Sequence, residues 1–127
     1  MLVQKQHLQT FLDVLMGTQG VLNLADSRIR DMFMKKIVAF IETYTEEKNK
    51  IYAQFALKKE DGTPDIDDGN YHFDPKDVIQ INEELMILAK EEVELSGVSK
   101  IKSFIEQSEY KPRAGDAEII DELLSKL

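Results

Sequence analysis

The middle of the chain carries a stripe of apolar residues that fits only a long helix. Its members are spaced mostly by three, four or seven residues, which places them on one side of an α-helix. They are Ile29, Phe33, Ile37, Phe40, Ile41, Tyr44, Ile51, Tyr52 and Phe55. The pattern continues nearly to Leu57, and Asp26 or Ser27 is a suitable N-cap. We therefore predict a helix of about 30 residues, roughly 45 Å long.

The next segment, residues 58–70, is acidic and rich in turn signals, and we call it the tongue. Asp61-Gly62 and Asp68-Gly69 are turn dipeptides, and Pro64 prevents the helix from continuing. A second helix should follow, because Asp74-Pro75 has the form of an N-cap and a first helical residue. Its apolar stripe is Val78, Ile81, Leu85 and Leu88, widened by Ile79, Met86 and Ala89. Two helices joined in this way predict an antiparallel helical hairpin with an acidic loop.

Short elements are expected around the hairpin. The alternation in Glu92-Val93-Glu94-Leu95 is typical of a strand, which could pair with Tyr71-His72-Phe73 as a minimal sheet. An N-terminal helix carries Leu8, Phe11, Leu12 and Leu15; Gly17 and Gly20 end it, and Val21, Leu22 and Leu24 form an apolar connector. Val98, Ile101, Phe104 and Ile105 mark a short helix, and Asp116 should cap a last one with Ile119, Ile120, Leu123, Leu124 and Leu127. The predicted fold is mainly α, a single helical domain over residues 1–127.

Composition narrows the function classes. The chain has no cysteine, which excludes disulfides, thiolate nucleophiles and cysteine-based zinc sites. The net charge is −8, with +3 in residues 1–59 and −11 in residues 60–127. An acidic half repels nucleic acid and anionic membranes, so we expect neither as a partner. No apolar run approaches the length of a membrane span, and we expect a soluble, intracellular protein.

The tongue is the first candidate for chemistry, because hard cations favour oxygen-rich loops. Its aspartates are Asp61, Asp65, Asp67 and Asp68. An EF-hand register starting at Asp65 fails, since Asn70 stands where glycine is needed and Lys76 where glutamate is needed. His72 near Asp68 and Asp74 could assist a metal, but a surface histidine is the simpler interpretation. We expect no metal, no cofactor and no catalytic residue.

One basic cluster and one apolar set are candidate binding surfaces. Arg28, Arg30 and Lys35, with Lys36, could contact phosphate or an acidic partner, although a solvated helix face is the simpler interpretation. The apolar stripe is most simply core, but any excess would form a dimer interface or a docking groove. The interface candidates are Phe33, Phe40, Tyr44, Ile51, Phe55, Ile120 and Leu124.

The order of these features resembles a family of small uncharacterised proteins encoded by bacteriophages and prophages of Gram-positive bacteria. The matching pieces are a Leu-rich first helix, Asp26-Ser27-Arg28-Ile29-Arg30, Glu46-Glu47-Lys48-Asn49-Lys50-Ile51, Lys58-Lys59-Glu60-Asp61-Gly62, Asp68-Gly69-Asn70-Tyr71, Ile81-Asn82-Glu83-Glu84-Leu85, Glu91–Leu95 and Ile119-Ile120-Asp121-Glu122-Leu123-Leu124. The resemblance implies a phage origin and a small helical accessory protein, located in the host cytoplasm or in a virion. It supplies no activity.

These features favour a non-catalytic interaction protein that self-associates and binds a phage or host protein, as a virion or assembly factor or as a regulator. An acidic DNA mimic, or another inhibitor of host defence, is the first alternative, because residues 60–127 could occupy a DNA-binding cleft. A small-ligand sponge is the second alternative. It would need a concave pocket lined by Arg28, Arg30 or Lys35.

Overall fold

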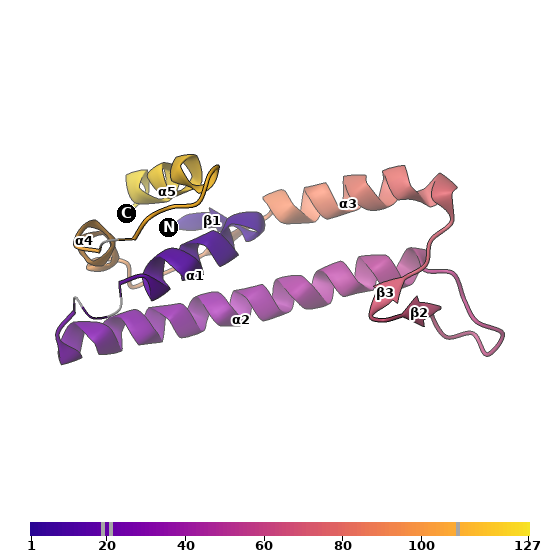
Figure 1. The fold of residues 1–127 in the computed structure, drawn as a ribbon, viewed down its shortest axis with the longest axis horizontal. Coiled ribbons are helices and arrows are strands. Elements are labelled where there is room, and N and C mark those ends of the chain that lie inside the picture. Colours follow the sequence, from indigo (N-terminus) through magenta and orange to yellow (C-terminus); the bar gives the residue numbers. More distant parts are fainter. Residues whose placement is uncertain (19, 21, 109) are drawn as a thin grey trace.

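The computed structural model describes residues 1–18, 20, 22–108 and 110–127. Its elements are β1 (Leu2–Gln4), α1 (Leu8–Met16), α2 (Leu24–Phe55), β2 (Ile66–Asp67), β3 (Asn70–Tyr71), α3 (Val78–Lys90), β4 (Glu92–Glu94), α4 (Ile101–Glu106) and α5 (Asp116–Ser125), with single 3₁₀ turns at Lys5–His7 and Pro75–Asp77. Val21 of the predicted connector lies outside the described residues. The predicted mainly helical fold is confirmed (Figure 1).

The long helix begins earlier than the sequence suggested. α2 has 32 residues and its N-cap is Asn23, whose side chain accepts a hydrogen bond from the backbone N–H of Asp26. Neither Asp26 nor Ser27 is the cap, because Asn23 caps equally well and Leu24-Ala25 can extend the helix by a further turn. Asp26 instead lies in the first turn, where its negative charge interacts favourably with the positive end of the helix dipole.

α3 returns alongside the second half of α2, which confirms the antiparallel hairpin (Figure 1). As predicted, Asp74 is the N-cap of the turn that leads into α3, and its side chain accepts a hydrogen bond from the N–H of Lys76. Pro75 occupies the first position of that turn, where a backbone N–H would have no partner within the helix, so proline sacrifices no hydrogen bond.

The predicted strand at residues 92–94 exists, but its predicted partner was wrong. β4 pairs antiparallel with β1, in a register that places Val3 opposite Val93. α3 carries the chain about 20 Å back along α2, so β4 lies at the opposite end of the hairpin from residues 71–73. The two-residue strand β3 pairs with β2 instead.

The tongue consists of turns and a short hairpin that project beyond the end of α2 (Figure 1). β2 and β3 form a hairpin whose central residues Asp68 and Gly69 both have positive φ, 48° and 77°, as a type I′ turn requires. Leu57 donates a backbone hydrogen bond to His72 and accepts one from Asp65, which joins the end of α2 to both sides of the hairpin. Backbone hydrogen bonds within and between these turns therefore give a defined structure to the segment that the sequence predicts as a loop.

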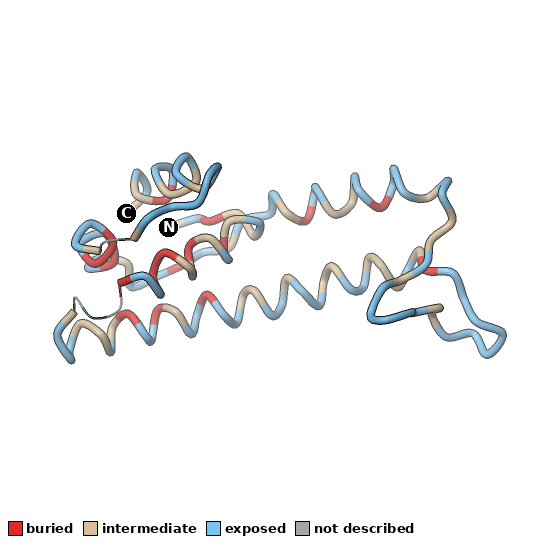
Figure 2. Tube along the Cα trace, in the orientation of Figure 1, coloured by how far each residue is buried: buried red, intermediate tan, exposed pale blue. Residues whose placement is uncertain are grey.

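The hydrophobic core lies at one end of the elongated molecule (Figure 2). It gathers α1, the first half of α2, the β1–β4 pair, α4 and α5, with Phe11 packed on Phe33 at a ring-centroid distance of 5.5 Å. The buried residues of α2 are Arg30, Phe33 and Ile37, all in its first half. The second half of α2 and α3 therefore project from the core as an arm, which we define as residues 40–90.

One of two predicted helix boundaries is confirmed and the other shifts by one residue. Gly17 does end α1, but in the ordinary right-handed region, with φ −69°. It is glycine because a Cβ there would lie 2.6 Å from Cδ2 of Tyr110. The N-cap of α5 is Gly115, with φ +90°, and the predicted cap Asp116 is the first helical residue.

Candidate functional site

Helix α3 has an inner and an outer face, and the inner face holds the arm together. Ile81 and Leu88 are buried against α2 and the turn at Lys5–His7. Because successive residues of an α-helix are rotated by about 100°, Ile79 and Met86 lie about 160° and 140° away from Ile81. The face opposite the buried residues is therefore partly apolar.

The structure exposes this outer face, and we define it as Ile79, Glu83, Met86, Ile87 and Lys90. The apolar members are 73%, 59% and 67% exposed for Ile79, Met86 and Ile87, respectively. The prediction that Ile79 and Met86 widen the buried stripe was wrong, since one neighbouring helix and one turn cover only one side of α3. The same 100° rotation, applied to the sequence, could have separated these two residues from Ile81 and Leu88.

The outer face is shallowly hollowed. A depression of about 300 Å³ is lined by Glu83, Met86, Ile87 and Lys90. Its two charged residues have opposite signs and lie seven residues, or two helical turns, apart along α3. The surface thus combines exposed apolar area with one negative side chain near its middle and one positive side chain at its C-terminal end.

Lys5 fixes α3 onto α2 at the base of the arm. Its Nζ lies 3.0 Å from Oε1 of Glu47 on α2 and 2.7 Å from Oε2 of Glu91 at the end of α3. Burial lowers the pKa of Lys5, but hydrogen bonds and attraction from Glu91 and Glu47 outweigh it, so the pKa is raised overall. This ion-pair clamp holds the C-terminal end of α3, next to Lys90 of the outer face.

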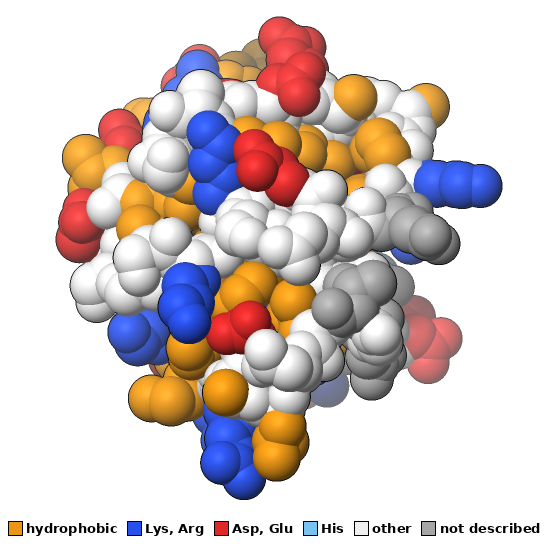
Figure 3. All heavy atoms as spheres, turned by 90° about the vertical axis from the view of Figure 1, so that its left-hand side faces the viewer, with side chains coloured by type: hydrophobic (Ala, Val, Ile, Leu, Met, Phe, Trp, Pro, Cys, Tyr) orange, Lys and Arg blue, Asp and Glu red, His pale blue; other side chains and the backbone are white. Residues whose placement is uncertain are grey.

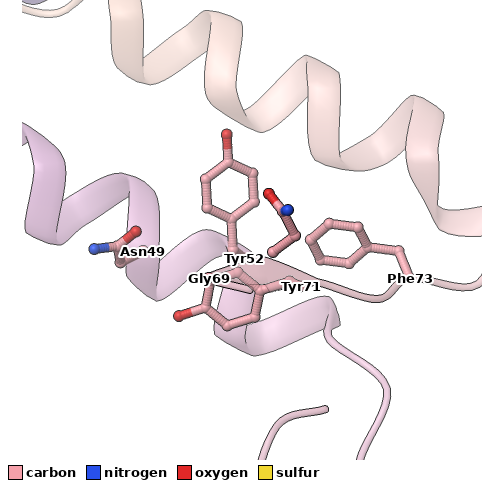
Figure 4. Close-up of a pocket in the computed structure, with 6 residues that line it drawn as sticks. Asn49, Tyr52, Gly69, Tyr71 and Phe73 are labelled. Carbon is pink, nitrogen blue, oxygen red and sulfur yellow. The ribbon is translucent and has the colours of Figure 1, made fainter. Parts of the chain in front are cut away.

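A cluster of aromatic rings fixes the other end of the arm (Figure 4). Tyr52 of α2 stacks on Tyr71 of β3 at 5.7 Å between centroids, and Phe73 lies 5.9 Å from Tyr52 and 6.2 Å from Tyr71. A hollow of about 300 Å³ beside the rings is also lined by Asn49 and Asn70. The rings explain how a short hairpin is held on the end of a single helix.

The predicted interface residues mostly serve internal packing. Phe33 is a fully packed core residue, only 2% exposed. Phe40, Ile120 and Leu124 are half-buried against the core. Tyr44, Ile51 and Phe55 are half-buried on the arm, and Lys48 places its ammonium 4.4 Å from the centre of the Tyr44 ring. The apolar stripe of α2 is therefore largely covered within the chain.

The predicted basic cluster does not form one surface. Arg30 is 9% exposed and its guanidinium binds Oδ1 of Asp31 and Oγ1 of Thr18, which in turn donates to the Leu15 carbonyl at the end of α1. It thus joins α1 to α2. Arg28 and Lys35 are exposed on another side of the helix, and Lys36 Nζ lies 3.3 Å from the Ser96 carbonyl.

The aspartates of the tongue lie in local turns. Asp61 Oδ1 accepts hydrogen bonds from the backbone N–H and the hydroxyl of Thr63, and these bonds lower the pKa of Asp61. Asp67 and Asp68 are exposed in the hairpin, and Asp65 is half-buried. Within the described ranges, no three or more His, Asp or Glu side chains converge closely enough to hold a metal ion.

Other exposed apolar side chains are less concentrated. Figure 3 shows the end of the molecule that carries the start of α2, where hydrophobic side chains appear in separate patches divided by polar and charged ones. Leu24 and Met32 of α2 and Met16 of α1 are the large exposed apolar residues of these elements near that end. In the described part of the chain, no helix is both long enough and apolar enough to cross a membrane.

Comparison with known proteins places this geometry in a family. A family model described as "Protein of unknown function (DUF1617)" matches residues 1–125. The chain belongs to the DUF1617 family. The match covers the core end and the arm together, so both are parts of the DUF1617 sequence pattern. No curated protein matches the chain, and no solved structure does.

Proposed function

We propose that this DUF1617 protein is a non-catalytic interaction protein, and that its binding surface is the outer face of α3. The observation that carries the proposal is the exposure of three large apolar residues on one face of a helix fixed at both ends. Scattered exposed apolar residues are normal, whereas a contiguous group with polar neighbours is typical of a protein interface. Arg30 and Asp61, two polar groups of the predicted sites, bind neighbouring groups of the same chain.

We further propose a phage or prophage origin, with a role in assembly or in regulating a host protein. This rests on the resemblance of the sequence to phage-encoded proteins. An exposed face on an already formed helix suits such a role, because a preformed interface loses little conformational entropy on binding.

Photocrosslinking tests the binding surface without assuming a partner. A photoreactive amino acid in place of Met86 should give a covalent protein adduct when the full chain is produced in its natural context. The same substitution at Lys50, which is exposed on α2, is the matched control and should give much less adduct. If Met86 gives no more adduct than Lys50, the outer face of α3 is not a protein-binding surface.

A further inference from the structure

We infer that the outer face of α3 binds a second copy of the same chain, with the two α3 helices antiparallel about a two-fold axis. This inference rests on the function proposed above and names the partner. The order of charged and apolar residues Glu83, Met86, Ile87 and Lys90 along the face supports it. Ile79 lies outside this paired segment.

The face is complementary to itself in one direction only. With the two-fold axis midway between positions 86 and 87, Glu83 of each copy lies opposite Lys90 of the other copy. Met86 of each copy then lies opposite Ile87 of the other. Each dimer gains two Glu83–Lys90 ion pairs, one on each side of an apolar centre, as expected for an isologous interface.

A parallel arrangement is disfavoured by the same residues. It would place Glu83 against Glu83 and Lys90 against Lys90 of the other copy, and like charges at such close range repel. Antiparallel helices pack with their axes about 8–10 Å apart, within reach of the long side chains of Glu83 and Lys90. The methylene stems of Lys90 would cover part of the apolar surface while its ammonium pairs.

The two copies would meet along the part of α3 nearest the core end, on the side opposite the buried residues Ile81 and Leu88 (Figure 1). In this register residues 78–82 of the second copy lie alongside residues 91–95 of the first, where α3 leads into β4. The two helices overlap over residues 83–90, about 12 Å, so the contact is smaller than the roughly 1,200–2,000 Å² of a standard interface. We therefore expect a weak, reversible dimer.

Charge reversal tests the inference with the full-length chain. Glu83→Lys places two lysines opposite two lysines, and Lys90→Glu places two glutamates opposite two glutamates. Each variant alone should dimerise at least about tenfold more weakly than the wild type in sedimentation velocity. Their equimolar mixture should regain the wild-type affinity, because every opposed pair is again of opposite sign. The double variant E83K/K90E should also dimerise like the wild type.

Matched variants and the crosslinking result separate the possible failures. Glu42→Lys and Lys50→Glu change exposed charges on α2 and should leave dimerisation unchanged. If the wild type stays monomeric at high concentration, or the mixture is no tighter than its components, the inference is wrong. If Met86 then still crosslinks to another protein, the proposed function stands without the dimer; if it crosslinks to nothing, both proposals fail.

Discussion

At the scale of single residues, several side chains have structural roles that their type alone does not suggest. The sequence predicts that Arg30 belongs to a basic patch, yet its guanidinium donates hydrogen bonds to Thr18 and Asp31. In the sequence Gly17 has the position of an ordinary helix C-cap, yet glycine is required there because the Tyr110 ring approaches too closely for a Cβ. Both roles depend on residues that the chain brings together from different elements.

Replacing Gly17 by Ala should destabilise the protein by about 1–3 kcal/mol, as expected for overpacking. The added Cβ would lie 2.6 Å from the Tyr110 ring, so the ring or the end of α1 must shift. Thermal or chemical denaturation measures the change. In a Tyr110→Leu background the same substitution should be markedly less destabilising. An equal effect in both backgrounds would show that the contact with Tyr110 is not the cause.

Replacing Lys5 by Met should destabilise the protein by about 1–2 kcal/mol, because two carboxylates lose a charged hydrogen-bond donor. Lys50→Met, at an exposed position, should change the free energy of unfolding by less than about 0.5 kcal/mol. Denaturant titration of the two variants makes the comparison. An equal loss in both would mean that the Lys5 clamp contributes nothing specific.

The Lys5 clamp should also depend on pH in a defined direction. The folded-state pKa of Lys5 is raised, so its stabilisation is complete below the unfolded-state pKa of about 10.4. It is lost as the pH rises through the higher folded-state pKa. The stability difference between the wild type and Lys5→Met should therefore be constant near neutral pH and shrink above about pH 10.4. A difference that grows there would contradict the assigned direction.

At the scale of elements, helices follow from the sequence much better than strand pairs. The apolar spacing of α2 and the Asp74-Pro75 start of the second helix are local signals, and both predictions are confirmed. The pairing of β1 with β4 joins residues about ninety positions apart, and no local pattern records it. The outer face of α3 is a different case. Apolar content alone predicts that Ile79 and Met86 belong to the buried stripe, whereas their angle around the helix places them on the opposite side.

The aromatic cluster should hold the tongue on the arm. Replacing Tyr52 by Ala removes the ring that stacks on Tyr71 and contacts Phe73. We expect faster hydrogen exchange at the backbone amides of Leu57 and Asp65, whose hydrogen bonds join the end of α2 to the hairpin, and of His72, which donates to the Asp65 carbonyl across the hairpin. Amides of the core end should keep their wild-type rates.

Lys50→Ala is the control for that experiment, since Lys50 is exposed on the same helix. It should leave exchange in the tongue unchanged. If Tyr52→Ala also leaves it unchanged, the turn hydrogen bonds alone are sufficient to order the tongue.

At the scale of the whole molecule, the buried core and the proposed binding surface lie at two different ends. The buried residues gather at the core end, while the arm rests on a few contacts along its inner face. The long helix α2 connects the two, because its first half belongs to the core and its second half supports α3. This division leaves the outer face of α3 free for a partner without uncovering the core.

The solution mass of an outer-face variant tests this division most directly. The chain mass is 14.6 kDa, and light scattering after size exclusion should show the wild type approaching twice that mass as its concentration rises. Met86→Ser with Ile87→Ser should remain at 14.6 kDa and stay folded. The control variant Leu24→Ser with Met32→Ser, at equally exposed apolar positions on α2, should associate like the wild type. If instead the control loses association and the α3 variant keeps it, the interface lies on α2 and the outer face of α3 is not the binding surface.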